Sequence, residues 1–156
     1  MTIAEIIPLT PQPWCRNPEG YVRHQKLLVI LAEWLEAQSI PLELPLEEES
    51  DRDHDDHGVD LIVSDTRIDL KSFPLEVYSN SLTWSSTYYK GRLAPLRRGL
   101  LTEWFVHPNG DDVSRWYAAP LSSLRTSKYG YQPYYIRRAV VTVAELVQDV
   151  FTSPSF

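Results

Sequence analysis

The sequence predicts a single domain of the α/β or α+β class, in which helices flank a mixed central β-sheet. Apolar residues recur at helical spacing towards both ends of the chain, and they alternate with polar residues, as in strands, between these ends. The 156 residues, of which 43% are hydrophobic, are sufficient for one hydrophobic core. We therefore expect one domain over residues 1–156.

Hydropathy and cysteine content predict a cytoplasmic protein without membrane contact. The apolar runs fall short of the roughly 18 residues that a membrane span requires. The single cysteine, Cys15, has no partner for an internal disulfide, which is typical of a reducing compartment.

The N-terminal part is expected to contain an arm, a helix and an edge strand. The first 19 residues hold four prolines and predict an extended arm. Residues 21–38 predict a helix, because four leucines form an apolar stripe at helical spacing and His24 shares their face. A histidine in such a stripe is more often a hydrogen-bonded core residue than a functional one. Residues 40–46 alternate apolar residues with two prolines, which is typical of an edge strand.

Two strands joined by a tight turn are expected within residues 57–72. If Asp65 and Thr66 form the two-residue loop, Asp60 lies opposite Lys71 and diagonal to Asp69, with all three side chains on one face. Diagonal neighbours lie roughly 7–8 Å apart, so two carboxylates there can bind one cation. Alternatively, the hairpin is merely solvated, and Asp60 and Lys71 form a weak surface ion pair.

This stretch resembles the core of the PD-(D/E)XK nucleases. Asp60 stands between apolar residues, and after the hairpin turn Asp69-Leu70-Lys71 completes the motif, while Val59 stands where the family has a proline. The resemblance implies a restriction-endonuclease-like fold over about residues 20–119 and hydrolysis of phosphodiester bonds in DNA with Mg²⁺ or Mn²⁺. It further implies that Asp60, Asp69 and the Leu70 carbonyl hold the metal and that Lys71 positions the attacking water.

The first helix departs from the pattern of this family. Many members carry a glutamate there, four or five residues after a glycine, whereas Gly20 is followed at these offsets by His24 and Gln25. This difference removes a possible third acidic ligand. Glu33 and Glu36 are alternatives for this role, but both are expected on the solvated side of the helix. His24 and Gln25 are therefore the residues to examine at the corresponding position of the site.

The rest of the chain is expected to form an irregular surface segment and a second hairpin before its last helix. Residues 73–99 lack periodicity, and Asn109-Gly110 predicts a turn between strands at 100–106 and 114–119. Pro120 predicts the start of a short helix, and residues 125–138 predict a basic, tyrosine-rich binding loop. A capping-box pattern from Thr142 predicts a helix through residue 150.

The net charge of −6 is unevenly distributed along the chain. Residues 47–60 hold eight acidic residues and one arginine, without the spacing of a calcium or zinc site, whereas residues 90–138 hold nine basic and three acidic residues. In a nuclease, aromatic and basic side chains after the first hairpin would contact double-stranded DNA. The expected contact residues are Tyr88, Tyr89, Lys90, Arg92, Arg97, Arg98, Arg125 and Lys128.

Three functions fit these observations. The first is a Mg²⁺-dependent DNA endonuclease, which would act as a homodimer in order to cut both strands of a duplex. The second is a catalytically inactive protein of the same fold that binds nucleic acid or a protein partner, which the missing glutamate favours. The third is an unrelated interaction module that uses its tyrosine- and tryptophan-rich surface. A lack of salt-sensitive DNA binding would favour the third.

Overall fold

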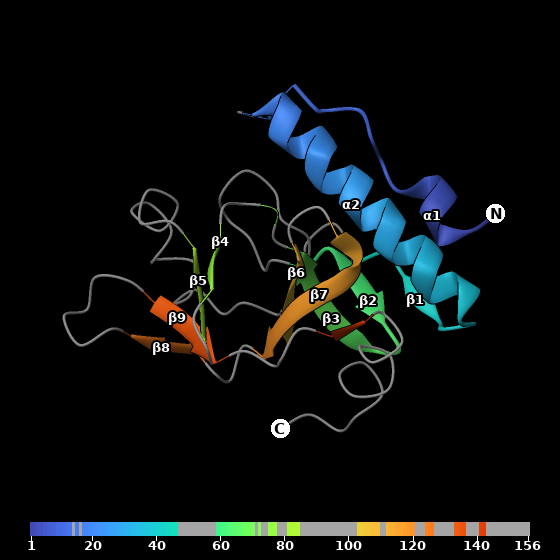
Figure 1. The fold of residues 1–156 in the computed structure, drawn as a ribbon. Coiled ribbons are helices and arrows are strands. Elements are labelled where there is room, and N and C mark those ends of the chain that lie inside the picture. The colour runs from blue at the N-terminus through green and yellow to red at the C-terminus, as the bar shows by residue number, and fades with distance from the viewer. Residues whose placement is uncertain are drawn as a thin grey trace.

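The structure contains an N-terminal pair of helices and two β-sheets (Figure 1). It is a computed structural model that describes residues 1–13, 15, 17–46, 59–70, 72, 75–77, 81–84, 103–109, 112–120, 124–126, 133–136 and 141–142. The described helices are α1 (Ile3–Ile6) and α2 (Pro18–Ala37). The larger sheet is formed, in spatial order, by β1 (Leu42–Glu43), β2 (Leu61–Val63), β3 (Thr66–Leu70), β6 (Trp104–Asn109), β7 (Asp112–Pro120) and β10 (Val141–Thr142). The smaller sheet is formed by β4 (Leu75–Val77), β5 (Ser81–Trp84), β9 (Pro133–Ile136) and β8 (Leu124–Thr126).

The larger sheet is mixed. Strand β3 runs parallel to β6, whereas the other neighbouring pairs of the larger sheet are antiparallel. Helix α2 lies across this sheet, and α1 lies beside the C-terminal half of α2 (Figure 1). The mixed central sheet is therefore confirmed, and the arrangement is consistent with the predicted α/β or α+β class. Strand β1 lies at the edge of the sheet, as the prolines around it predicted.

Helix α2 begins three residues before the predicted start. Asn17 caps it by accepting a hydrogen bond from the Gly20 N–H (3.0 Å), and Pro18 occupies the first turn, where its missing N–H costs nothing. A side chain at position 20 would collide with the Asn17 amide, so the glycine makes room for this cap. The predicted apolar stripe faces the sheet, where Leu28, Leu31 and Leu35 are buried in the core.

The predicted extended arm contains a short helix and is docked. Thr2 caps α1, and the backbone N–H groups of Ile3 and Ala4 donate to the Glu36 carboxylate near the end of α2 (3.0 Å each). Ile7 is buried in the core. The first proline of the chain, Pro8, follows these residues, so the prolines do not prevent a helical turn before them.

The first hairpin is present, but its loop lies one residue earlier than predicted. Val63 pairs with Thr66, so the loop residues are Ser64 and Asp65, and both adopt positive φ angles (47° and 66°). A loop at Asp65-Thr66 would place the β-branched Thr66 in this unfavourable region. The predicted pairing of Asp60 with Lys71 is therefore wrong in register. Moving a two-residue loop by one residue shifts the partner of each strand residue by two positions. The positions that share a face of the sheet therefore stay the same.

Several expectations for the second half of the chain are wrong. The segment 73–99, predicted to be irregular, contains β4 and β5, which pair with each other. The predicted helix from Pro120 and the predicted loop at 125–138 instead contribute β8 and β9 to the smaller sheet. The second hairpin is confirmed, but Asn109 belongs to β6 and pairs with Asp112, so the turn begins one residue later than predicted. The predicted last helix lies outside the described residues beyond Thr142, which belongs to β10.

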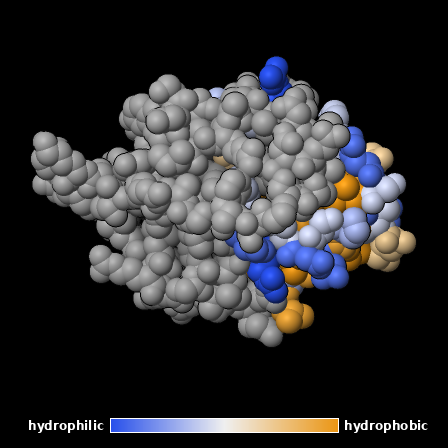
Figure 2. Space-filling view, turned by 90° about the horizontal axis from the view of Figure 1, so that it is seen from below, coloured by the Kyte–Doolittle hydropathy of each residue, from blue (hydrophilic) through white to orange (hydrophobic). Residues whose placement is uncertain are grey.

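Most of the buried side chains lie between α2 and the larger sheet. Trp116 on β7 is the largest fully buried side chain among the described residues, and Leu61, Ile68 and Leu70 from β2 and β3 pack in the same core. On the described part of the face seen in Figure 2, apolar side chains are visible between hydrophilic ones. No helix in the described part of the chain is long and apolar enough to cross a membrane.

Candidate functional site

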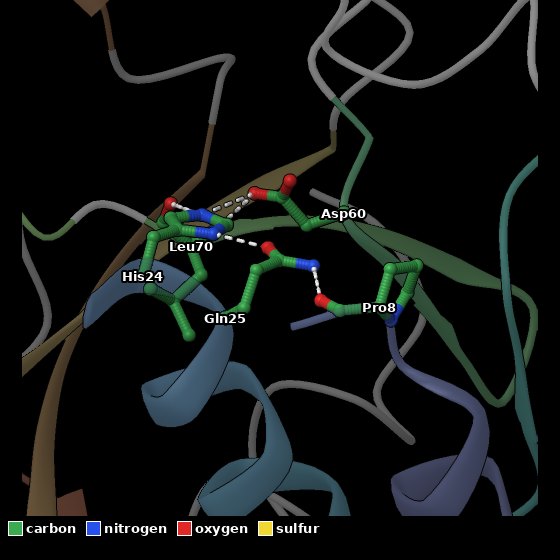
Figure 3. Close-up of polar contacts among 5 residues, drawn as sticks. All are labelled: Pro8, His24, Gln25, Asp60 and Leu70. Carbon is green, nitrogen blue, oxygen red and sulfur yellow. Dashed lines mark hydrogen bonds and ion pairs between the residues drawn. The ribbon is translucent and has the colours of Figure 1, made fainter. Parts of the chain in front are cut away.

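The candidate site lies where the first half of α2 passes the start of β2 and the end of β3 (Figure 3). The Nε2 atom of His24 lies 3.2 Å from Asp60 Oδ2 and 2.9 Å from the backbone oxygen of Leu70. His24 belongs to α2, Asp60 precedes β2, and Leu70 ends β3. Three separate elements therefore meet at one imidazole nitrogen.

The carboxylate of Asp60 is fixed by the backbone of the neighbouring strand. Its Oδ2 atom accepts a hydrogen bond from the Leu70 N–H (2.8 Å), and the Asp60 N–H donates to the Ile68 oxygen (2.8 Å). Leu70 thus binds Asp60 through its N–H and His24 through its carbonyl. Because the Asp60 side chain is only 12% exposed, these contacts lie largely out of water. The carboxylate is held in one orientation.

Gln25 fixes the other side of the His24 ring. Its Nε2 atom donates to the Pro8 carbonyl (2.8 Å), so its Oε1 atom faces His24 Nδ1 at 2.7 Å (Figure 3). A carbonyl oxygen can only accept a hydrogen bond, which assigns the amide nitrogen to the side of Pro8. Oε1 is also only an acceptor, so Nδ1 of His24 must carry a proton.

His24 is held as an imidazolium. Its Nε2 atom faces a carboxylate and a carbonyl, which both accept, so this nitrogen is protonated as well as Nδ1. Burial by itself would lower the pKa of His24. The charge of Asp60, the hydrogen bonds to Asp60 and Gln25, and the charge of Asp69 together raise the pKa of His24 to about 9.

Two further residues lie close enough to affect the charges of the site. Asp69 is buried in β3, paired with Phe105 of β6, and its charge contributes to the raised pKa of His24. Burial, together with the charges of Cys15 and Asp60, raises the pKa of Tyr21. Sequence reasoning missed Tyr21, although it stands three residues before His24 and hence on a neighbouring part of the helix surface.

Two of the oxygens that were predicted to bind a metal ion instead contact the His24 imidazolium. Among the residues that the structure describes, no group of three or more His, Cys, Asp or Glu side chains could hold a metal ion. However, Asp60 Oδ2 and the Leu70 oxygen, two of the predicted metal-binding atoms, converge on one atom, Nε2 of the positively charged His24 ring. Carboxylate and carbonyl oxygens are ligands that Mg²⁺ and Mn²⁺ prefer. The two oxygens therefore form an incomplete cation site that holds an imidazolium.

The remaining predicted site residues lie outside the described part of the chain, with the exception of Arg125. Arg125 lies in β8, where its backbone pairs with Tyr134. The residues outside the described ranges are Lys71, Tyr88, Tyr89, Lys90, Arg92, Arg97, Arg98, Lys128 and the acidic segment 47–58. Their roles stay predictions.

No protein-family model, curated protein sequence or solved structure matches this chain. The resemblance to the PD-(D/E)XK nucleases therefore rests on Asp60 and on the tripeptide Asp69-Leu70-Lys71.

Proposed function

We propose that the protein is a metal-dependent endonuclease that hydrolyses phosphodiester bonds in double-stranded DNA. The observation that supports this proposal is the convergence of Asp60 Oδ2 and the Leu70 oxygen on Nε2 of the His24 imidazolium, close enough to the buried Asp69 for its charge to act on the ring. Both oxygens come from residues of the nuclease-like motif. A cation is the group that they can stabilise together.

Each residue of the motif has a role in this proposal. Asp60, Asp69 and the Leu70 carbonyl would hold Mg²⁺ or Mn²⁺. When bound, such an ion polarises a phosphoryl oxygen and lowers the pKa of a coordinated water. Lys71 would position the attacking water and offset the negative charge that develops on the phosphate. His24 Nε2–H lies between Asp60 Oδ2 and the Leu70 oxygen, so the ring would have to move aside when the ion binds, and its positive charge would then attract the phosphate.

The proposal extends to the substrate, the assembly and the location of the protein. The nine basic residues between 90 and 138 would bind the DNA backbone, with an affinity that falls at higher salt, because the release of counterions from the DNA then becomes less favourable. Cleavage of both strands would require a homodimer. A reducing, cytoplasmic environment suits the single cysteine.

A second candidate is a catalytically inactive protein of the same fold that binds nucleic acid or a protein partner. The observation that favours it is the position of His24, which replaces the expected glutamate and already neutralises Asp60. In such a protein the imidazolium would take the place of a metal ion as a structural charge.

Cleavage of supercoiled plasmid with Mg²⁺ or Mn²⁺ tests the proposal. Asp60→Asn, Asp69→Asn and Lys71→Ala should abolish nicking. Asp65→Asn should retain it, because Asp65 is exposed in the hairpin turn and asparagine tolerates its positive φ. Nicking that survives all three substitutions would move the active site elsewhere. Salt-sensitive DNA binding without cleavage by either metal form would support the inactive binder instead.

A further inference from the structure

A continuous chain of hydrogen bonds connects the N-terminal segment to the candidate site. It begins at the Pro8 carbonyl, passes through both ends of the Gln25 amide (2.8 and 2.7 Å) and crosses the His24 ring from Nδ1 to Nε2. It ends at Asp60 and at the backbone of Leu70. Figure 3 shows these five residues in contact, drawn from four separate parts of the chain.

The direction of this chain is set at Pro8. An amide side chain can be placed in two orientations that exchange its donor and its acceptor. Only one orientation gives the Pro8 carbonyl a donor, and the same orientation gives His24 Nδ1 an acceptor. Gln25 is 8% exposed, so little water is available to replace either partner. The contact with Pro8 therefore determines that the oxygen of the Gln25 amide, and not its nitrogen, lies against His24.

The N-terminal segment is anchored by contacts that do not involve the site. Glu36, three turns further along α2, accepts hydrogen bonds from the N–H groups of Ile3 and Ala4 (3.0 Å each). Ile7 is 4% exposed in the core and directly precedes Pro8. The position of the Pro8 carbonyl thus depends on docking of the segment as a whole.

We propose that Gln25 is a positioning residue that transmits the docking of residues 1–8 to the imidazole of His24. When the segment is docked, Gln25 holds the ring against Asp60 and Leu70. When the segment is released, the amide loses the partner that orients it, and the ring loses its fixed acceptor. The importance of this coupling for catalysis rests on the proposed nuclease function, whereas the coupling itself is independent of it.

Nuclear magnetic resonance of the histidine ring N–H groups in the full chain tests the coupling. In the wild type, the His24 Nδ1–H should exchange slowly with water and give a resolved signal, which His24→Gln would identify by its loss. His107, whose Nδ1 donates to the Pro108 carbonyl at 2.6 Å, provides an internal reference.

Variants that act at different points along this series of hydrogen bonds distinguish an effect on the position of His24 from an effect on packing. Gln25→Met keeps the approximate shape but removes both hydrogen bonds, so the His24 Nδ1–H signal should disappear. Gln25→Glu keeps an acceptor for His24 and should restore that signal. Ile7→Ala and Glu36→Ala should release the N-terminal segment and also abolish the signal. Leu42→Ala, a truncation at the edge of the same core, should leave it in place.

The decisive comparison is between the release of the N-terminal segment and the Nδ1–H signal of the His24 ring. Release of the segment is measured by faster amide exchange at Ala4 in Ile7→Ala, and by loss of the nuclear Overhauser contacts of Ile7 with the core in Glu36→Ala. Release accompanied by loss of the His24 signal would support the proposal. Release of the segment with an unchanged His24 signal would overturn it. Using two releasing variants keeps the test decisive if the cavity left by Ile7→Ala prevents folding. A failure of plasmid cleavage would overturn the proposed nuclease but would not alter these signals.

Discussion

His24 and Asp60 form an ion pair that joins helix α2 to the segment before β2. Nε2 and Oδ2 are 3.2 Å apart, and the side chains are 19% and 12% exposed. The imidazolium also donates hydrogen bonds to Gln25 and to the Leu70 carbonyl, so its two N–H groups have three acceptors in all. Such a pair stabilises the protein only while the imidazole keeps both protons.

Stability should fall between neutral and alkaline pH because of His24. Its pKa is raised from 6.5 to about 9 on folding, so its contribution is complete below about pH 6.5 and is lost as the pH rises through 9. The difference between these pKa values corresponds to about 3 kcal/mol. Urea unfolding at pH 6 and pH 9.5 should show a larger loss in the wild type than in His24→Gln. Equal losses in both proteins would contradict this assignment.

Asp60→Asn should destabilise the protein by about 2–4 kcal/mol at pH 7, because it leaves a largely buried imidazolium without its counter-charge. The asparagine oxygen can still accept from the Leu70 N–H, so the loss should come mainly from the charge. Denaturant unfolding measures this loss. The control Asp65→Asn, in the exposed turn, should change the free energy of unfolding by less than about 0.5 kcal/mol. Similar values for both variants would show that the ion pair contributes little.

His24→Glu should make stability depend strongly on divalent cations. Without metal, a carboxylate facing Asp60 and the Leu70 carbonyl should be repelled. With Mn²⁺ or Mg²⁺, the added acidic ligand should favour binding. At an ion concentration about 100 times the Kd, binding adds about 2.7 kcal/mol, or about 5–10 °C in Tm. Thermal unfolding with and without metal should show a larger shift in His24→Glu than in the neutral control His24→Gln. Equal shifts would place the cation elsewhere.

Double replacement of Arg97 and Arg98 by alanine should weaken DNA binding and its salt dependence. Each phosphate contact contributes about 0.9 to the slope of log K against log salt, so two lost contacts should reduce the slope by about 2. Fluorescence anisotropy on a duplex over a range of salt concentrations measures the slope. Arg23→Ala, on the exposed surface of α2, is the matched control. An unchanged slope in the double variant would exclude these residues from the interface.

Local sequence signals predicted the elements that carry most of the site. Helix α2 has enough turns for its leucine spacing to be distinctive, and the alternation around Asp60 and Asp69 identified the first hairpin. The exact loop position was missed because neither Ser64 nor Asp65 is a glycine or asparagine, the residues that usually indicate such a turn.

The elements that the sequence did not predict are short or depend on distant partners. Helix α1 has four residues, too few for a periodic pattern. Strands β5 and β9 pair across a long separation in sequence, and neither is long enough to indicate its partner. In the site, the contact of Gln25 with Pro8 has no sequence signal, because the acceptor is a backbone carbonyl that any residue could supply.

The parallel pairing of β3 and β6 has a consequence for the connection between these two strands. Glu103 and Arg67 exchange hydrogen bonds at the start of this pairing, which fixes how β6 enters beside β3. A parallel neighbour requires the chain to return across the sheet after Leu70. The connection must therefore leave from the candidate site itself, beginning with Lys71. Insertions or substitutions within this connection would change the part of the chain that follows the site. They would leave the register of the sheet and the His24–Asp60 pair intact.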